Sequence, residues 1–366
     1  MTRETPLHAV HERLGASFTD FAGYQMPVRY TSDLAEHHAV RKGAGLFDLS
    51  HMAEIECEGA QVAQFLDYAL SNSLSALVEG QAKYSLLLAE DGGVIDDLIV
   101  YRLGEHKYLI VANASNRDAA VEALQARSAG FDVEVSDTSD EWALIALQGP
   151  LAAGILESSA VALDSPLAEL RYYRIVGGTF GSEPILVART GYTGEDGMEI
   201  FIASAHAEEL WDALMQAGGD QLTLCGLACR DTLRLEAGMP LYGHELSRDV
   251  TPAQAGLAGV VVNAKDSFVG KDRAIAVKSS RVLVGLLAEG KRAPRAEYSV
   301  LDAQGSVIGE ITSGALSPTL GFPIAMAYVE DTHRDVGSEL FVDVRGASLP
   351  VTVTSLPFYS RKKVTS

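Results

Sequence analysis

KYSLLLAEDGGVIDDLIVYRLGEHKYLIVAN, residues 83–113, consists of three apolar runs separated by EDGG and GEHK. Apolar runs of this length are typical of β-strands, and the short polar breaks rich in Gly, Asp and Glu are typical of tight turns. Strands joined by tight turns pair in antiparallel fashion. The stretch therefore predicts three neighbouring strands of an antiparallel sheet.

The middle run carries two adjacent carboxylates, Asp96 and Asp97, among apolar residues. An unpaired buried charge costs roughly several kcal/mol, so other groups must hold these acids in place. Side chains alternate along a strand, so the two acids point to opposite faces. Either they form an ordinary edge-strand pair next to the turn at residues 90–93, or one of them points into an enclosed cavity.

Other segments repeat this pattern of strands and helices. Residues 46–59, LFDLSHMAEIECEG, are predicted to be a strand, and so are residues 171–178, RYYRIVGG, and the two apolar runs that follow them. Residues 5–15, 32–41, 116–127 and 206–219 have helical signals. Tight turns outnumber crossover helices, which favours two β-rich α+β units with antiparallel sheets.

Helical spacing disappears after Arg281, where short strands alternate with Gly and Pro turns. This alternation is typical of a small barrel or a sandwich. The loop-rich stretch from about Gly243 to Arg281 is the expected linker.

Composition excludes several classes of protein. The chain has 366 residues, is 47% hydrophobic and carries a formal net charge of −20, so binding to nucleic acid or to anionic lipid is not expected. Its apolar runs are shorter than the roughly 20 residues of a membrane helix, and its N-terminus resembles no leader. Three cysteines indicate a reducing compartment, which is the cytoplasm, or an organelle matrix if a leader has been removed.

Familiar cofactor and nucleophile motifs are missing. The sequence has neither the G-x-G-x-x-G fingerprint of dinucleotide sites nor a G-x-S-x-G elbow. Cys225 and Cys229 are spaced so that a helix would let them share a metal, but buried packing explains them better. The sequence therefore predicts neither a metal nor a nucleotide. Basic residues cluster at positions 291–295 and 361–363, where they would either bind an anionic group or simply face solvent.

Two further polar residues interrupt apolar patterns. Glu199 follows a glycine-rich turn and lies between Met198 and Ile200. A carboxylate there could accept two parallel hydrogen bonds from an amidine-like edge such as that of a pterin, or it could face solvent. Arg230 either points inward or forms a structural pair with Asp231.

Five strings distributed over essentially the whole length resemble the T-protein family of the glycine cleavage system, the tetrahydrofolate-dependent aminomethyltransferases. They are LFDLSHM, GGVIDDLIVY, RTGYTGEDGMEI, CRDTLRLEAGMPLYG and ITSGALSPTLG. The resemblance implies an α+β protein with two ferredoxin-like α+β units and a C-terminal β-barrel, arranged around a central folate-binding opening. Residues 1–50 and 139–245 would form the first unit, 51–138 the second, 246–280 the linker and 281–366 the barrel.

Site residues follow from the same resemblance. The second acid of IDD, Asp97, matches the family's catalytic aspartate. The residues that match folate-binding positions are Tyr84, Asn113, Tyr192, Glu199 and Arg230, and Tyr359 and Arg361 are nominated in the tail. The chain departs from common family residues at Ala53, Cys229 and Gly259.

The implied reaction moves the one-carbon unit of aminomethyl-dihydrolipoyl H-protein to tetrahydrofolate and releases ammonia and 5,10-methylenetetrahydrofolate. The implied partner is lipoylated H-protein, and the expected state is a monomer. Two alternatives share the scaffold. A folate-dependent demethylase would act on a small amine, sulfonium or aryl ether, and an accessory protein would bind folate without catalysis. A third alternative is an unrelated structural protein that binds no folate.

Overall fold

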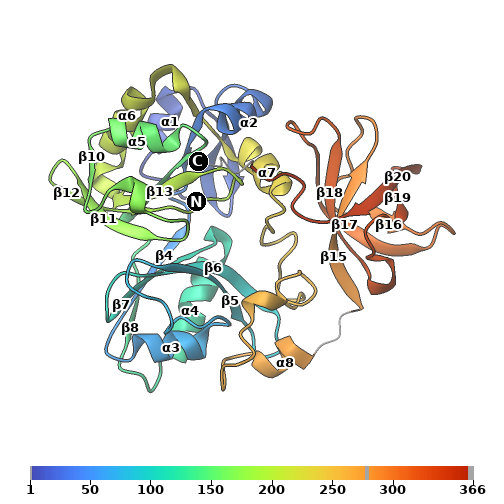
Figure 1. Cartoon of the computed structure of the whole chain (residues 1–366), viewed down its shortest axis with the longest axis horizontal. Helices are drawn as coiled ribbons and strands as arrows, with labels where there is room; N and C mark the ends of the chain where they lie inside the picture. Colours follow the sequence, from blue (N-terminus) through green and yellow to red (C-terminus); the bar gives the residue numbers. More distant parts are fainter. Residues whose placement is uncertain (1, 277–279, 362–366) are drawn as a thin grey trace. The chain divides into compact units, whose positions relative to one another are not determined.

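The computed structural model describes residues 2–276 and 280–361, and the chain divides into two compact units. The first unit comprises the chain up to Leu87 together with Asp96–Arg230. The second comprises Leu88–Ile95 together with the chain from Asp231 onward. Figure 1 follows the chain by colour from blue to red. Among residues 2–276 and 280–361, no helix combines the length and apolar character needed to cross a membrane.

A seven-stranded sheet with the order β10-β11-β12-β13-β9-β3-β14 forms one part of the first unit. Its pairs are antiparallel except for β14, which runs parallel to β3. The strands are β3 (Ala44–Asp48), β9 (Trp142–Gln148), β10 (Val161–Leu163), β11 (Ile175–Phe180), β12 (Glu183–Ala188), β13 (Gly197–Ala203) and β14 (Leu222–Leu224).

Helices α1 (His8–Arg13), α5 (Ala152–Ser158) and α6 (Ala207–Gly218) pack on this sheet (Figure 1). Their apolar sides meet the central strands in one core, where Val10, Ile155 and Trp211 are almost completely buried. Burial of this apolar surface is the main driving force for the layer. Helix α2 (Asp33–Lys42) is capped by Ser32, whose side chain accepts a hydrogen bond from the Ala35 N–H. A two-stranded ribbon, β1 (Ser17–Phe21) with β2 (Tyr24–Arg29), completes the N-terminal region.

A separate five-stranded sheet has the strand order β5-β6-β7-β4-β8. It contains the three strands predicted from residues 83–113, which are β5 (Ala82–Leu88), β6 (Val94–Arg102) and β7 (Lys107–Ala112), and this prediction is confirmed. The other strands are β4 (Ala53–Glu58) and β8 (Glu134–Asp137), and the helices are α3 (Val62–Ala69) and α4 (Arg117–Arg127). Antiparallel pairing explains how the strands are joined by short turns.

The single strand predicted for residues 46–59 is wrong. Strand β3 ends at Asp48, and β4 begins at Ala53 in the other sheet. A turn separates them, because the Met52 N–H donates to Leu49 O and the Ser50 N–H donates to the Asp48 carboxylate. The apolar run therefore crosses from one sheet to the other, and hydropathy alone does not reveal this change.

The second unit contains a closed β-barrel with the strand order β15-β18-β17-β16-β19-β20. Its strands are β15 (Arg281–Ala288), β16 (Ser299–Leu301), β17 (Val307–Leu316), β18 (Pro323–Glu330), β19 (Glu339–Val344) and β20 (Ala347–Thr354). Closure leaves no free sheet edge and decides between the two predicted architectures in favour of the barrel. Helix α8 (Lys271–Ala276) precedes the barrel, and α7 (Leu227–Glu236) spans the division between the units.

The predicted α+β class with a C-terminal β-barrel is confirmed. The proposed domain boundaries and the arrangement around an opening stay predictions.

Candidate active site

Asp96 and Asp97 lie on β6, between the edge strand β5 and the central strand β7 of the five-stranded sheet. The register of β6 with β7 pairs Ile99 with Val111, so Asn113, just beyond the end of β7, stands opposite Asp97. Because β7 ends there, the Asn113 side chain is free to turn toward both acids. The strand pairing thus brings one amide nitrogen to both carboxylates.

Asp96 is completely buried and accepts three N–H bonds. Asn113 donates its backbone N–H at 3.0 Å and its side-chain amide at 2.8 Å. Asn116, from the short helix η1 (Ala114–Asn116), donates its side-chain amide at 2.7 Å. All three donors are neutral, so they satisfy the carboxyl group without pairing its charge.

Asp97 is half-buried and has different partners. The Tyr84 hydroxyl on β5 donates to Oδ2 at 2.9 Å, and the Asn113 amide lies 2.9 Å from Oδ1. Each carboxylate oxygen has two lone pairs, so both oxygens can accept a further donor. The side chain is therefore held in one orientation while keeping capacity for a ligand.

No ion pair to Asp96 or Asp97 occurs among residues 2–276 and 280–361. Burial, together with the adjacent Asp97 charge, raises the pKa of Asp96 to about 8. Burial raises the pKa of Asp97 to about 6, and the hydrogen bonds from Tyr84 and Asn113 limit that rise. The two adjacent carboxyl groups therefore hold a proton more readily than ordinary aspartates do, because burial disfavours their charged forms.

Glu199 lies on the central strand β13 of the seven-stranded sheet and is 8% exposed. The Thr190 hydroxyl donates to its Oε2. The Tyr101 hydroxyl lies 3.2 Å from the Thr190 hydroxyl and so links β6 to this carboxylate. Burial raises the pKa of Glu199, whereas the Thr190 bond and the Arg230 charge oppose the rise. The solvent-facing alternative for Glu199 is wrong, because the side chain is buried.

The loop after β12 approaches the sheet closely at Gly191. A Cβ atom on Gly191 would lie 2.0 Å from Gln148 Oε1, so a larger residue would displace this contact. Gln148 also donates to Thr190 O at 3.1 Å. The glycine-rich turn thereby fixes Thr190 beside Glu199.

Arg230 lies on α7 with its guanidinium carbon 4.8 Å from the centre of the Tyr192 ring. The start of this helix is fixed by Glu36, whose buried carboxylate accepts the Gly226 N–H at 3.0 Å. Burial lowers the pKa of Arg230, and the Glu199 charge partly restores it. The alternative pair with Asp231 is wrong, because Asp231 binds Arg234 at 2.7 Å.

All six residues that the resemblance predicts for the core of the site form two clusters in the first unit, one around Asp97 and one around Glu199. Tyr84 and Asn113 bond Asp97. The Arg230 charge acts on Glu199, and the Tyr192 ring packs against the Arg230 guanidinium. The Tyr101–Thr190 contact joins the clusters, and the pKa of Tyr84, raised mainly by burial and by Asp97, is raised further by Tyr192. The first unit thus places the two clusters side by side.

The two nominated tail residues, Tyr359 and Arg361, belong to the second unit. There the Tyr359 N–H donates to Glu236 O at 2.8 Å, and Arg361 is exposed.

Three residues of the clusters were not predicted from the sequence. Asn116 donates a hydrogen bond to Asp96, and Thr190 donates one to Glu199. The charges of Asp97 and Glu199 both act on the Tyr173 hydroxyl. The polar spacing of Asn113 and Asn116 is a signal that could have revealed the first of them. The strand predicted for residues 171–178 is only partly correct, because β11 begins at Ile175 and Tyr173 precedes it with a φ of 60°. The prediction therefore gave no reason to single out Tyr173.

The residues that depart from the family have local roles. Cys229 is buried and its thiol donates to Gly226 O at 3.3 Å, one residue before Arg230. Cys225 is also buried, and its thiol donates to Glu36 O at 3.7 Å. These contacts agree with the packing interpretation of both cysteines. Ala53 is buried on β4, and Gly259 lies in η5 (Ala258–Val260).

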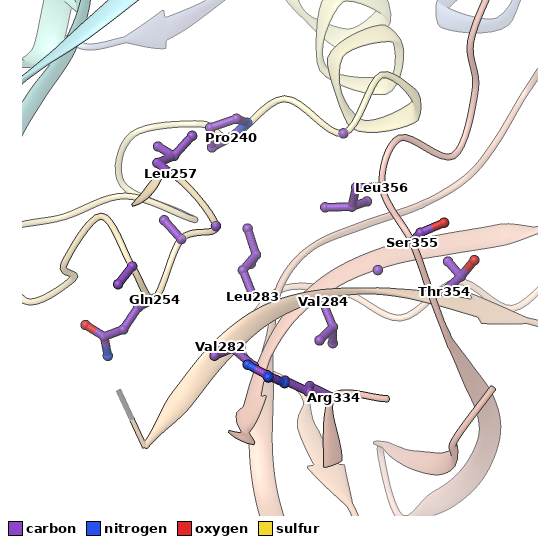
Figure 2. Close-up of a pocket in the computed structure, with 15 residues that line it drawn as sticks. Pro240, Gln254, Leu257, Val282, Leu283, Val284, Arg334, Thr354, Ser355 and Leu356 are labelled. Carbon is purple, nitrogen blue, oxygen red and sulfur yellow. The ribbon is translucent and has the colours of Figure 1, made fainter. Parts of the chain in front are cut away.

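A cavity of about 460 Å³ lies in the second unit, and its lining includes no residue of the two clusters. Figure 2 shows that Leu283, Leu356 and other small or apolar residues form most of this lining. Arg334 is its charged member and binds Asp331 at 2.9 Å. No nominated site residue lines this cavity.

The basic clusters predicted near the C-terminus are only partly described. Lys291, Arg292 and Arg295 each donate to a backbone carbonyl of the second unit, namely that of Gly321, Val344 and Gly314. Lys362 and Lys363 lie outside the described residues.

Two family models match the chain. The GCVT N-terminal domain matches residues 7–265, and the glycine cleavage T-protein C-terminal barrel domain matches residues 281–360. Together they cover both units.

Relatives match over nearly the full length. An aminomethyltransferase of Cutibacterium acnes is 56% identical over 98% of this chain and 99% of its own length. One of Streptomyces coelicolor is 54% identical over 99% and 98%. The crystal structure of glycine cleavage system aminomethyltransferase T from Bartonella henselae covers 98% of each chain with a TM-score of 0.91 and 38% identity. The chain therefore belongs to the glycine cleavage T-protein family of aminomethyltransferases.

Proposed function

We propose that Asp97 is the catalytic carboxylate for transfer of the one-carbon unit from the aminomethyl-dihydrolipoyl arm of H-protein to tetrahydrofolate. The products are ammonia, 5,10-methylenetetrahydrofolate and dihydrolipoyl H-protein. One observation carries the proposal: Asp97 is half-buried and oriented by Tyr84 and Asn113, and both of its partners are neutral. A carboxylate held in this way retains its charge for the reaction.

The second cluster fits the ring edge of a folate. Among the described residues, Thr190 is the hydrogen-bond donor to Glu199, so the other oxygen of this buried carboxylate can accept N–H groups. Charge-assisted bonds of this kind contribute roughly 1.5 to 3 kcal/mol each. We assign Glu199 to binding the amidine-like edge of the pterin, and Arg230 and Tyr192 to support of the same ring.

Tetrahydrofolate, when bound, supplies the amine that accepts the carbon. Asp97 would accept a hydrogen bond from this N–H, stabilise the positive charge that develops there, and take up the released proton. A pKa of about 6 suits this work, because the group is ionised at neutral pH yet basic enough to hold a proton briefly. Tyr84 and Asn113 orient the carboxylate before the reaction begins.

Asp96 has a supporting role in this proposal. With a pKa of about 8, it is mainly protonated at neutral pH and does not repel the charge on Asp97. The two bonds that Asp96 accepts from Asn113 also anchor that residue, which in turn orients Asp97. Asp96 is therefore a positioning residue.

The test is Asp97→Asn. The new amide can keep the Asn113 contact through its oxygen and donate to the Tyr84 hydroxyl through its nitrogen, so the site geometry should survive. We expect tetrahydrofolate-dependent ammonia release from aminomethyl-loaded H-protein to fall by about 10²- to 10⁴-fold. Calorimetric binding of tetrahydrofolate should change little.

Asp118→Asn is the matched control, because Asp118 is an exposed aspartate on α4 of the same unit. Full turnover by the Asp97→Asn enzyme would contradict the assignment. Turnover of small methylated substrates without H-protein would instead favour a folate-dependent demethylase, and folate binding without any turnover by the unaltered chain would favour an accessory protein.

Lipoylated H-protein is the proposed donor partner, and a monomer is the proposed working form. Because the net charge is −20 and charges are screened beyond roughly 8 Å at physiological salt, docking should depend on local contacts. Sedimentation velocity of the chain alone and with H-protein tests both statements. A stable dimer of the chain alone would contradict the second.

A further inference from the structure

The loop that follows α7, residues 237–257, binds the start of β6. The Tyr242 hydroxyl donates to Val94 O at 3.0 Å. The Val94 N–H lies 3.1 Å from the carbonyl oxygens of both Ser247 and Val250. All four residues belong to the second unit. Val94 is completely buried, so its backbone polar groups need partners inside the protein, and the loop supplies partners for both of them.

A close backbone approach fixes the same place a second time. A Cβ atom on Gly93 would lie 1.9 Å from Arg248 O, so any side chain at this position would push the loop away. The turn between β5 and β6 also bonds to itself, because the Ala89 N–H donates to Gly93 O at 2.8 Å. The turn is therefore held as one piece against the loop.

The acids of the candidate active site follow on the same strand. Asp97 lies three residues after Val94, which in an extended strand is a distance of roughly 10 Å. The pairs between β6 and β7 run from Ile99 to Arg102. Asp97 therefore lies between two anchors, the ladder with β7 on one side and the contact of Val94 with the loop on the other. A shift of either anchor would move its side chain.

The orientation of Asp97 depends on where β6 lies relative to its two neighbours. Its hydrogen bonds come from Tyr84 on β5 and from Asn113 just beyond β7, each at 2.9 Å. Hydrogen bonds weaken steeply when donor and acceptor move out of line. A small movement of β6 would therefore loosen both bonds and turn the carboxylate. Because the turn also ends β5, the loop fixes the strand that carries Tyr84 as well.

We propose that Tyr242 is a positioning residue for Asp97, and that Gly93 provides the close approach that the Tyr242 hydrogen bond requires. This inference rests on the proposed function. Tyr242 acts through the Val94 carbonyl, whereas Asp97 acts on the reacting atoms. Accurate placement of a catalytic group governs its rate, and a displacement of about 1 Å can lower turnover about 10²-fold.

The main test compares Tyr242→Phe with Gly93→Ala. The phenylalanine variant removes the hydroxyl and keeps the ring, so kcat for tetrahydrofolate-dependent ammonia release should fall about tenfold. The alanine variant pushes the loop away from the turn and should lower kcat about a hundredfold. The Kd for tetrahydrofolate, measured by calorimetry, should stay within about threefold in both variants, because Glu199 and its partners are unchanged.

The pH profile supplies a readout that a merely structural residue would not change. Burial raises the pKa of Asp97, and the hydrogen bond from Tyr84 limits the rise, so loosening of this bond should raise the pKa further. The fall of kcat on the acid side reports the interacting Asp96 and Asp97 carboxyl groups. In Tyr242→Phe this fall should begin at a higher pH than in the unaltered chain.

Thr312→Val is the matched control, because the Thr312 hydroxyl donates to Met326 O at 3.1 Å inside the barrel of the same unit. It removes the same kind of bond, from a hydroxyl to a backbone carbonyl, and should leave kcat, the Kd and the pH profile unchanged. Equal losses of kcat in Thr312→Val and Tyr242→Phe would overturn the inference.

The remaining outcomes separate this inference from the proposed function. A native kcat and a native pH profile in Tyr242→Phe, with turnover still lost in Asp97→Asn, overturn the inference alone. Loss of folded structure in both Tyr242→Phe and Gly93→Ala, measured by circular dichroism, would identify the contact as structural and would also overturn it. Full turnover by Asp97→Asn overturns the proposed function as well.

Discussion

Two buried groups of acids, one in each unit, are stabilised in opposite ways. In the second unit Glu245 is fully buried and pairs with Arg234 at 2.9 Å, and Arg234 is only 1% exposed. Arg234 also binds Asp231, Ser313 and the Met239 carbonyl. In the first unit Asp96 and Asp97 are held by amides and a tyrosine hydroxyl.

The difference separates a structural acid from a chemically available one. A carboxylate bound to a buried guanidinium has its charge compensated inside the fold, and losing either partner leaves an uncompensated charge. A carboxyl group bound by neutral donors keeps its position without losing its ability to exchange a proton. The Arg234–Glu245 pair is therefore expected to affect stability, and the Asp96–Asp97 pair to affect turnover.

Arg234→Met should show the largest effect on folding. It leaves Glu245 buried without its cation, so we expect the free energy of unfolding to fall by about 3–5 kcal/mol in urea denaturation. The double variant Arg234→Met with Glu245→Leu should recover most of this loss, since no buried charge remains. Asp231→Asn is the control, because the Asp231 side chain is 53% exposed. An equally stable single variant would erase the contrast between the two regions.

Glu199→Gln tests whether the third buried acid behaves like the Asp pair. The amide can still accept the Thr190 bond but has lost its charge, so the Kd for tetrahydrofolate should rise about tenfold to a hundredfold. Isothermal calorimetry measures this change, and the free energy of unfolding should not fall. Unchanged affinity would mean that Glu199 does not contact the ligand.

The pH dependence of stability gives the next effect. Because the pKa of Asp97 is raised to about 6, the fold favours its protonated form. The contribution of Asp97 to the free energy of unfolding is therefore fully present below its unfolded pKa near 4, and it is lost as pH rises through about 6. At pH 8 the Asp97→Asn variant should therefore be at least as stable as the unaltered chain, and its free energy of unfolding should be up to about 3 kcal/mol higher. A marked loss of stability in this variant would place Asp97 among the structural acids.

Transfer activity should follow the opposite course with pH. Protonation of Asp97 removes the charge used in the reaction, so kcat should fall below about pH 6 with one proton taken up. Single-turnover rates measured between pH 5 and 8 would show this fall, because that interval contains the raised pKa of Asp97. A rate that does not change with pH there would contradict an ionised Asp97.

Thr190→Val should give the smallest effect. It removes the hydroxyl that orients Glu199 and also contacts the Tyr101 hydroxyl. A neutral hydrogen bond contributes about 1 kcal/mol, so the Kd for tetrahydrofolate should rise roughly fivefold. Thr179→Val on β11, where Thr179 is exposed, is the control.

Local patterns predicted much of this molecule correctly. The three strands of residues 83–113 and the antiparallel sheets follow from alternation and turn residues, which are properties of short segments. The single strand predicted for residues 46–59 was wrong, because the short segment Leu49–Met52 connects strands of two different sheets, and the sequence pattern does not show which sheet each half joins. Tyr173 was placed in a strand for the same reason, since its φ is imposed by bonds to Arg189 and Ala82.

The sequence by itself determined which acids interrupt apolar strands and, through the family motifs, that Asp97 rather than Asp96 is the nominated carboxylate. Only the tertiary structure decided which partners those acids have. Asn113 reaches both aspartates because β7 ends opposite Asp97, and Asp231 binds Arg234 instead of Arg230. The physical reason is that charge compensation and desolvation depend on neighbours in space, which residue order alone does not specify.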